Sequence, residues 1–153
     1  MREVAVLLHN IRSAHNVGSI FRTADAAGVS KIFLSGYTPA PIDRFGYGRK
    51  DIAKVALGAE NSVPWDYQKN PYAIVADLQS EKWKIVGVEQ DVRAMDYRKF
   101  RPKGRVLYLL GNEVRGISPG LRKKCDVLIE IPMHGKKESL NVAVAAGIIL
   151  FTC

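Results

Sequence analysis

Three short polar segments follow apolar stretches of the chain and carry the side chains best suited to chemistry on a ligand. The first contains Asn16 and Arg22. If this segment is helical, Arg22 points nearly opposite the apolar stripe and is available to an anion. The second segment contains Glu113 between Gly111 and Gly116. Glycines at these positions permit tight turns and a close approach of backbone to a ligand.

The third polar segment covers residues 131–141 and ends with Ser139 and Asn141. Each segment also has an ordinary interpretation when taken alone. Arg22 could be solvated surface, the Gly111 segment a turn, and Ser139 or Asn141 a cap for the next helix. Open α/β sheets place their ligand crevices just beyond the ends of their strands. The three segments together therefore indicate a ligand site.

The elements that would position these segments alternate along the chain. A helix with one apolar face is predicted at residues 16–27, with Gly28 as its stop, a second helix at 71–79, and a buried helix, apolar all round, at 141–153. Strands are predicted at residues 4–8, 31–34, 84–88, 105–110 and 127–131. This alternation predicts the α/β class, with a mainly parallel sheet covered by helices on both faces.

A long loop is predicted at residues 35–51, and loops of this length are uncommon unless they are functional. It contains Arg44 and Arg49, and Lys50 lies at its end, next to the aromatic residues Phe45 and Tyr47. Basic side chains can hold phosphates, and interleaved aromatic rings can stack on unpaired bases. The formal net charge of +8 points the same way, so Arg44, Arg49 and Lys50 are candidate RNA-binding residues.

Composition excludes several other classes of protein. A chain of 153 residues suits one domain, and its longest apolar run, 142–151, is far shorter than the roughly 20 residues that span a bilayer. Two cysteines form no disulfide framework, and His9, His15 and His134 lack metal-ligand spacing. We therefore expect a cytoplasmic protein with no membrane segment and no metal. The first strand is followed by no glycine-rich phosphate loop, which argues against a nicotinamide or nucleotide-phosphate enzyme.

The three polar segments, in order, resemble the three motifs of the SpoU/TrmH family of SPOUT RNA methyltransferases. The matching residues are 16–22, 110–116 and 131–146, and Ile-Pro-Met followed by Ser-Leu-Asn-Val-Ala-Val-Ala is a very specific signal. The resemblance covers essentially the whole chain, so residues 1–153 are expected to form one methyltransferase domain without a separate RNA-binding domain.

The resemblance implies an α/β fold with a deep trefoil knot near the C-terminus, and a homodimer. It also implies S-adenosylmethionine as cofactor, bound by the knotted loops mostly through backbone groups. The residues that would line the adenosine site are Gly111, Ile131 and Leu140, with Val88 as a further candidate. Apolar residues suit this role because adenine is recognised by backbone hydrogen bonds and flanking apolar contact.

The resemblance further implies transfer of a methyl group to a ribose 2′-hydroxyl of tRNA or rRNA. Arg22 would grip a phosphate beside the target, since a guanidinium stays protonated and is a poor base. Asn16 would position Arg22 or the ribose, Glu113 would orient an arginine or the substrate, and Ser139 and Asn141 would hydrogen-bond the reacting centre. In family members the cofactor and this arginine come from opposite subunits. The alternative is a non-catalytic RNA-binding protein of the same fold.

Overall fold

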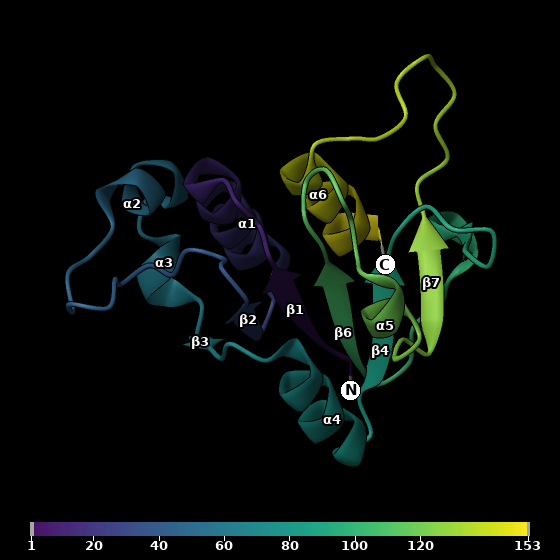
Figure 1. Ribbon diagram of the computed structural model, residues 1–153, viewed down its shortest axis with the longest axis horizontal. Helices are drawn as coiled ribbons and strands as arrows, with labels where there is room; N and C mark the ends of the chain where they lie inside the picture. The colour runs from purple at the N-terminus through teal and green to yellow at the C-terminus, as the bar shows by residue number, and fades with distance from the viewer. Residues whose placement is uncertain (1, 153) are drawn as a thin grey trace.

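A computed structural model describes residues 2–152, which form a seven-stranded sheet in the order β3-β2-β1-β6-β4-β7-β5 (Figure 1). All paired strands run parallel. The strands are β1 (Glu3–His9), β2 (Lys31–Ser35), β3 (Trp65–Tyr67), β4 (Lys84–Val88), β5 (Met95–Asp96), β6 (Arg105–Leu110) and β7 (Val127–Glu130).

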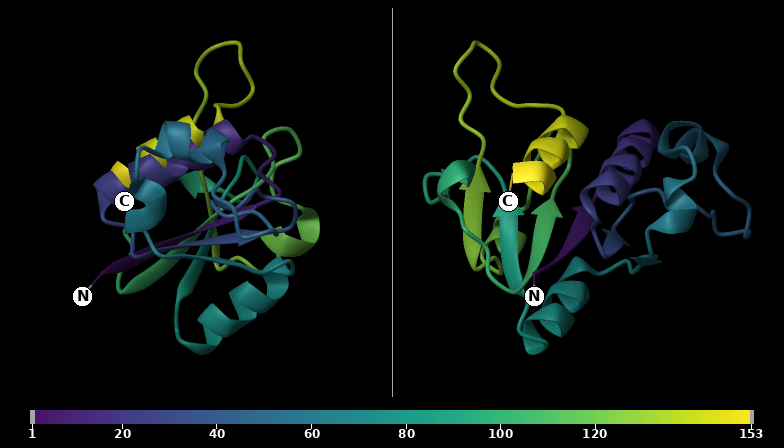
Figure 2. Two further views of the ribbon diagram at one scale, coloured as in Figure 1. Left: turned by 90° about the vertical axis from the view of Figure 1, so that its left-hand side faces the viewer. Right: turned by 180° about the vertical axis from the view of Figure 1, so that it is seen from behind.

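Helices cover both faces of the sheet (Figure 2). They are α1 (Ala14–Ala27), α2 (Lys50–Ala56), α3 (Ala59–Ser62), α4 (Pro71–Ser80), α5 (Pro119–Arg122) and α6 (Val142–Thr152), with a 3₁₀ turn, η1, at Tyr97–Lys99. Side chains of α1, α2, α3 and α6 form one hydrophobic cluster with the sheet, and side chains of α4 and α5 form a second. The expected α/β class, a parallel sheet between two helical layers, is confirmed.

The central strands are apolar on both sides, as a sheet between two helical layers requires. In β6, Val106 and Tyr108 pack into the first cluster, whereas Leu107 and Leu109 pack into the second. Its neighbour β1 alternates in the same way. Burying such side chains contributes about 1.5–3 kcal/mol each relative to leaving them exposed. The buried central strands therefore hold the loops that follow them in fixed positions.

The parallel arrangement brings the loops that follow the strands to one edge of the sheet. Leu8 of β1 pairs with Leu110 of β6, and Val88 of β4 pairs with Ile129 of β7, so these strands end at nearly the same level. The three polar segments of the sequence follow β1, β6 and β7 at this edge. The segment after β7 has no regular secondary structure and rises away from the body of the molecule in every view (Figures 1 and 2).

Most predicted elements are confirmed, and two predictions need correction. The loop predicted at residues 35–51 ends at residue 49, because Lys50 and Asp51 already belong to α2; the rest of α2 and all of α3 lie in residues 52–62, for which no element is predicted. The last helix is expected to be buried all round, but it is buried on one side only. Val144 is 51% and Phe151 64% exposed, because α6 lies in the outer layer with one face against the sheet. The trefoil knot stays a prediction.

Candidate active site at the carboxyl edge of the sheet

A chain of hydrogen bonds joins the three polar segments through Asn16, Glu113 and Asn141. The Asn16 side-chain amide (Nδ2) donates to Oε2 of Glu113 over 3.1 Å. The Asn141 side-chain amide donates to Oδ1 of Asn16 over 3.2 Å. One residue from each segment is thus fixed relative to the other two, although 97 and 125 positions separate the bonded pairs.

Glu113 is held by the start of α1 as well as by Asn16. Its two carboxylate oxygens accept from the backbone N–H groups of Arg12, over 2.9 Å, and Ser13, over 3.0 Å. Partial burial opposes ionisation of this carboxyl, but the hydrogen bonds to its charged form outweigh burial and lower the pKa of Glu113. Glu113 is therefore an ionised acceptor at neutral pH, fixed in direction.

Asn141 reaches the network because it also begins α6. Its Oδ1 accepts from the backbone N–H of Ala143 over 2.8 Å and of Val144 over 3.3 Å, which is the usual bonding of a helix N-cap. With the oxygen used in this way, the amide N–H₂ is directed to Asn16. Asn141 therefore caps α6 with its side-chain oxygen and joins the polar network with its side-chain nitrogen.

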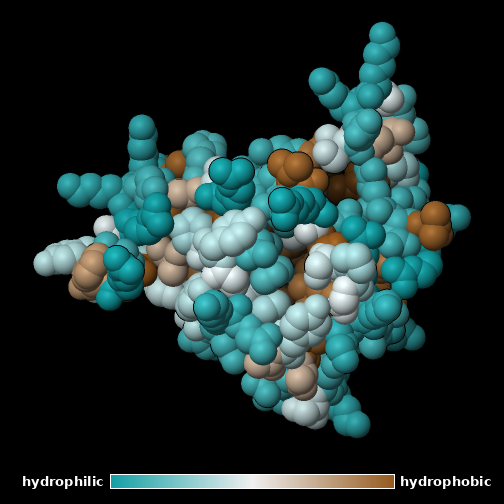
Figure 3. All heavy atoms as spheres, in the orientation of Figure 1, coloured by the Kyte–Doolittle hydropathy of each residue, from teal (hydrophilic) through white to brown (hydrophobic). Residues whose placement is uncertain are grey.

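A cleft lies beside this network, where β4, β6 and β7 end. Together with its open mouth it holds about 760 Å³ of free space. Its apolar lining includes Leu110, Val142 and Ala145. In the surface view, apolar atoms are visible in a hollow beneath the rising loop (Figure 3). The residues predicted to bind a cofactor or reacting centre that line it are Val88, Gly111, Glu113, Ile131, Ser139 and Leu140.

Two glycines allow the cleft wall to fold back on itself. A Cβ atom at Gly111 would lie 2.5 Å from the carbonyl carbon of Gly116, and one at Gly116 would lie 2.0 Å from Oε2 of Glu89. Gly116 also has a φ of 68°, which disfavours other residues. These close approaches pack the segment of residues 111–116, which lines the cleft, tightly against itself and against Glu89.

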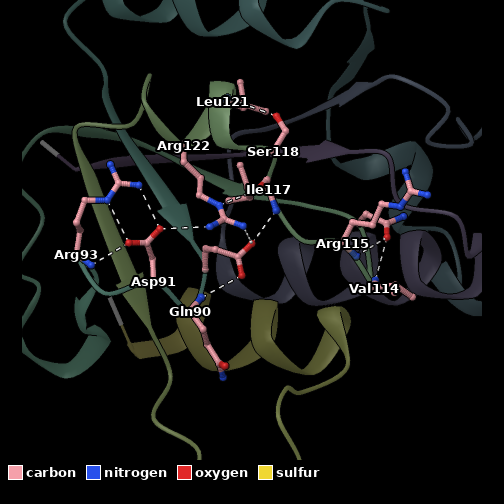
Figure 4. Close-up of polar contacts among 11 residues, drawn as sticks. Gln90, Asp91, Arg93, Val114, Arg115, Ile117, Ser118, Leu121 and Arg122 are labelled. Carbon is pink, nitrogen blue, oxygen red and sulfur yellow. Dashed lines mark hydrogen bonds and ion pairs between the residues drawn. The ribbon is translucent and has the colours of Figure 1, made fainter.

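Glu89 is a cleft residue that the sequence analysis missed. One of its carboxylate oxygens accepts from the Ile117 N–H over 2.6 Å and lies 3.8 Å from Nη2 of Arg122. Arg122 in turn donates to the Ile117 carbonyl over 2.7 Å and to Asp91 over 3.3 Å (Figure 4). This cluster ties the segment after β4 to the segment after β6. Glu89 is the first residue after β4. The rule that polar residues directly after parallel strands mark the ligand site could therefore have identified it from the sequence.

The cluster continues outward through Asp91. Its carboxylate accepts hydrogen bonds from the side chain and the backbone N–H of Arg93 (Figure 4). These bonds, together with the guanidinium of Arg122, lower the pKa of Asp91. Glu89 and Asp91 are therefore paired with Arg93 and Arg122, and these ion pairs hold this wall of the cleft in place.

Arg22 and the basic loop lie apart from the network. Arg22 is on the exposed side of α1, and within residues 2–152 its guanidinium makes no hydrogen bond or ion pair. Arg44 lies over the ring of Phe45, 4.9 Å from its centroid, and Arg49 forms an ion pair of 2.7 Å with Asp51. Lys50 is exposed at the start of α2. The structure thus unites four of the five predicted catalytic residues at one edge and leaves Arg22 separate.

Two other features bear on the class of site. Among residues 2–152, no three His, Cys, Asp or Glu side chains gather closely enough to hold a metal ion. Over the same residues, none of the helices has the length and apolar character needed to cross a membrane.

The fold and the site define an α/β protein with a small-molecule cleft and an adjoining polar network at the carboxyl edge of a parallel sheet. Residues 3–151 match the family model described as the SpoU rRNA Methylase family. The chain belongs to this family.

Individual relatives agree with this assignment. The chain is 35% identical over 150 residues to the 23S rRNA (guanosine-2′-O-)-methyltransferase RlmB of Ralstonia nicotianae, covering 95% of this chain and 56% of that protein. It is 37% identical to the RlmB of Salmonella typhi, covering 98% and 59%. A crystal structure of the AdoMet-bound rRNA methyltransferase from Sinorhizobium meliloti superposes with a TM-score of 0.89 at 31% identity, covering 98% and 55%. The chain therefore spans a little over half the length of these relatives.

Proposed function

We propose that the protein is an S-adenosylmethionine-dependent RNA methyltransferase acting on a ribose 2′-hydroxyl of rRNA or tRNA. The observation that carries the proposal is the hydrogen-bonded chain Asn141–Asn16–Glu113 at the rim of the cleft. It brings one residue of each motif together, and residues that act in the same reaction must lie close to one another. The relatives named as 23S rRNA guanosine-2′-O-methyltransferases support the same activity and favour rRNA.

The cleft suits S-adenosylmethionine in its chemistry. Leu110, Ile131 and Leu140 offer apolar contact to an adenine ring, and the close-packed turn at Gly111 presents backbone groups. The AdoMet-bound relative from Sinorhizobium meliloti supports this choice of cofactor. When bound, the cofactor supplies a methyl group on a positively charged sulfur, which a ribose oxygen can attack directly.

The residues of the chain align the two reactants and place charge. Asn16 and Asn141 are held by their bonds to Glu113 and to each other, so they can orient a ribose hydroxyl without rearranging. Ser139, which lines the cleft, is the further hydroxyl at the reacting centre. Alignment of this kind can be worth roughly 7–11 kcal/mol of the barrier. The proton of the 2′-hydroxyl leaves to water, since arginine and asparagine are poor bases.

Arg22 enters the site through dimerisation in this proposal. The outward face of α6 exposes Val144 and Phe151, both apolar, and a second copy of the chain would cover it. Arg22 of one subunit would then hold a phosphate beside the cleft of the other. The domain of residues 1–153 thus acts as a homodimer, and cytoplasmic location stays a prediction.

Two measurements test the proposal. Calorimetry with S-adenosylhomocysteine in the presence of a chelator is expected to give one binding event per chain, unaffected by metal removal. Incubation with labelled S-adenosylmethionine and total RNA, followed by mapping of the modified nucleotide, is expected to place the label on a ribose 2′-oxygen. RNA binding without cofactor binding or methyl transfer would instead support the non-catalytic RNA-binding alternative.

A further inference from the structure

A second cleft lies on the other side of the segment that follows β6. It opens where β1, β2 and β6 end, and its lining residues are Arg12, Tyr37, Asn112, Val114 and Arg115. The last three of these residues also line the first cleft, so the two clefts share one wall. A group bound in the second cleft therefore lies next to whatever occupies the first.

The floor of the second cleft is fixed by hydrogen bonds among three loops. The Asn112 side-chain amide donates to the Asn10 carbonyl and to the Tyr37 hydroxyl, each over 2.9 Å. The Asn10 side chain accepts from the Tyr37 N–H over 3.1 Å. Asn10 has a φ of 57°, and residues held in such sparsely populated conformations cluster at functional sites. The floor is thus built before any ligand arrives.

Two arginines at this cleft have no acidic partner. Arg12 and Arg115 are exposed, and across residues 2–152 neither guanidinium forms an ion pair or a hydrogen bond. Their backbone N–H groups are fixed, on Glu113 and on Asn112 respectively. The nearby carboxylate of Glu113 already accepts from the N–H groups of Arg12, Ser13 and Asn16. Two like charges facing one fixed cleft favour an anion there.

Tyr37 adds an aromatic surface to the same cleft. The residue is 57% exposed, while its hydroxyl is tied to Asn112, so the ring is both accessible and held in direction. Exposed, oriented rings of this kind stack on unpaired bases. Phosphate-binding guanidiniums and a stacking ring are the set of groups that a single-stranded nucleotide requires.

We propose that the second cleft binds the nucleotide that is methylated, with Arg12 and Arg115 on its flanking phosphates and Tyr37 on its base. The inference rests on the proposed function and adds to it the residues that hold the acceptor. The shared wall then places the acceptor ribose beside the methyl donor. Glu113 lines the first cleft and accepts from the backbone N–H of Arg12 in the second. The basic loop at residues 44–50 would hold more distant parts of the RNA.

Charge removal at the cleft tests the proposal against general electrostatics. The probe is a fluorescein-labelled uridine decanucleotide, and its dissociation constant is measured by anisotropy at several salt concentrations. The double variant Arg12→Gln/Arg115→Gln is compared with Lys84→Gln/Lys124→Gln, which removes two exposed charges near the opposite edge of the sheet. We expect about tenfold or greater weakening only for the arginine variant, with a salt slope smaller by about 0.7 for each phosphate that is no longer bound. Equal weakening of both variants would overturn the proposal.

Two substitutions of Tyr37 separate stacking from structure. Tyr37→Phe removes the bond to Asn112 and keeps the ring, whereas Tyr37→Leu removes both. We expect Tyr37→Phe to bind the decanucleotide like the unmodified protein, and Tyr37→Leu to bind it roughly tenfold more weakly. Similar losses in the two variants, tracking the thermal midpoint, would assign Tyr37 a structural role and contradict stacking.

Cofactor binding distinguishes the inference from the proposed function. S-adenosylhomocysteine affinity is expected to be unchanged in Arg12→Gln, because Arg12 lines the second cleft and not the first. A loss of that affinity would place Arg12 on the cofactor and overturn its assignment to RNA. If the unmodified protein transfers no methyl group, yet the arginine variant still loses RNA binding selectively, the proposed reaction fails while the cleft stands as an RNA site.

Discussion

Two polar regions follow strands of the same sheet, but different kinds of bonds hold them. In the segment after β6, Glu113 and Asn112 bond to groups about 100 positions away along the chain. In the loop after β2, Asp43 bonds to the N–H groups of Phe45 and Tyr47, two and four positions away. The bonds of Asp43 do not tie the tip of this loop to the sheet, whereas long-range bonds fix the first segment to it.

This difference matches two tasks within one function. Methyl transfer requires atoms held within a fraction of an ångström, which long-range bonds to a rigid frame supply. Contact with a folded RNA requires exposed groups that can adjust, and Phe45 and Tyr47 are 70% and 71% exposed. Substitutions in the first region should therefore affect catalysis and stability, and substitutions in the loop only RNA affinity.

The largest expected effect is on methyl transfer by Arg22→Ala. Arg22 is exposed and makes no contact with another described side chain through an ion pair or hydrogen bond, so the thermal midpoint should barely change. A positive charge held on the phosphate beside the reacting 2′-oxygen stabilises the negative charge that develops there by about 3–4 kcal/mol, so the rate should fall by roughly two to three decades. The rate is measured with labelled S-adenosylmethionine. Full activity of this variant would contradict the catalytic assignment.

Mixed dimers extend this test to the shared site. Leu140→Arg should block the cofactor cleft of its own subunit, because Leu140 lines that cleft. Neither variant should be active alone, and mixing them should restore one working site in each heterodimer. Lack of complementation would contradict only the proposal that Arg22 acts across the dimer interface.

The next largest effect is on stability, through Glu113. Glu113→Ala leaves the N–H groups of Arg12 and Ser13 and the amide of Asn16 without their acceptor. We expect a loss of about 2 kcal/mol in the free energy of unfolding, measured by urea titration. A loss no larger than that of an ordinary surface substitution would show that water replaces the carboxylate, and that the network does not hold the site.

Acid sensitivity gives a separate measure of the same carboxylate. Because the pKa of Glu113 is lowered on folding, its ionised form stabilises the protein above its usual pKa of about 4.3. That contribution disappears as the pH falls through the lowered folded-state pKa. The unfolding free energy of Glu113→Gln should therefore fall less steeply with acid than that of the unmodified protein. Parallel pH profiles would contradict this assignment.

A smaller effect is expected on cofactor affinity from Glu89→Gln. Glu89 holds Ile117 and Arg122 and lines the cleft, so loss of its charge should loosen the wall after β6. We expect roughly tenfold weaker binding of S-adenosylhomocysteine by calorimetry, in line with the loss of one charged hydrogen bond. Arg93→Gln is the matched control, because it removes an exposed outer member of the same cluster. Equal effects of the two would contradict a role for Glu89 at the cleft.

The sequence predicted the elements with strong periodicity and the residues at strand ends. Strands 84–88 and 105–110 agree with β4 and β6 to the residue. Strands β3 and β5, of three and two residues, are too short to leave a pattern. The uniform apolar character of α6 could not reveal which face the sheet covers. Side-chain contacts such as that of Asn16 with Glu113 depend on tertiary packing across 97 positions, which no local pattern encodes.

The smallest effect distinguishes basic residues within the loop. Arg49 is engaged with Asp51, and this contact raises the pKa of its guanidinium, so binding a phosphate would cost the existing ion pair. Arg44 and Lys50 have no such partner within residues 2–152, apart from the contact of Arg44 with the Phe45 ring. Arg44→Gln/Lys50→Gln should therefore weaken RNA binding more than Arg49→Gln, with a salt slope smaller by about 0.7 for each phosphate released. Anisotropy with the labelled decanucleotide measures both. Because the side-chain hydrogen bonds within residues 43–51 are local, cofactor affinity and the thermal midpoint should stay unchanged for substitutions at all three positions. A larger loss from Arg49→Gln would mean that Asp51 releases its arginine to the RNA, and a change in cofactor affinity would mean that loop and cleft are coupled after all.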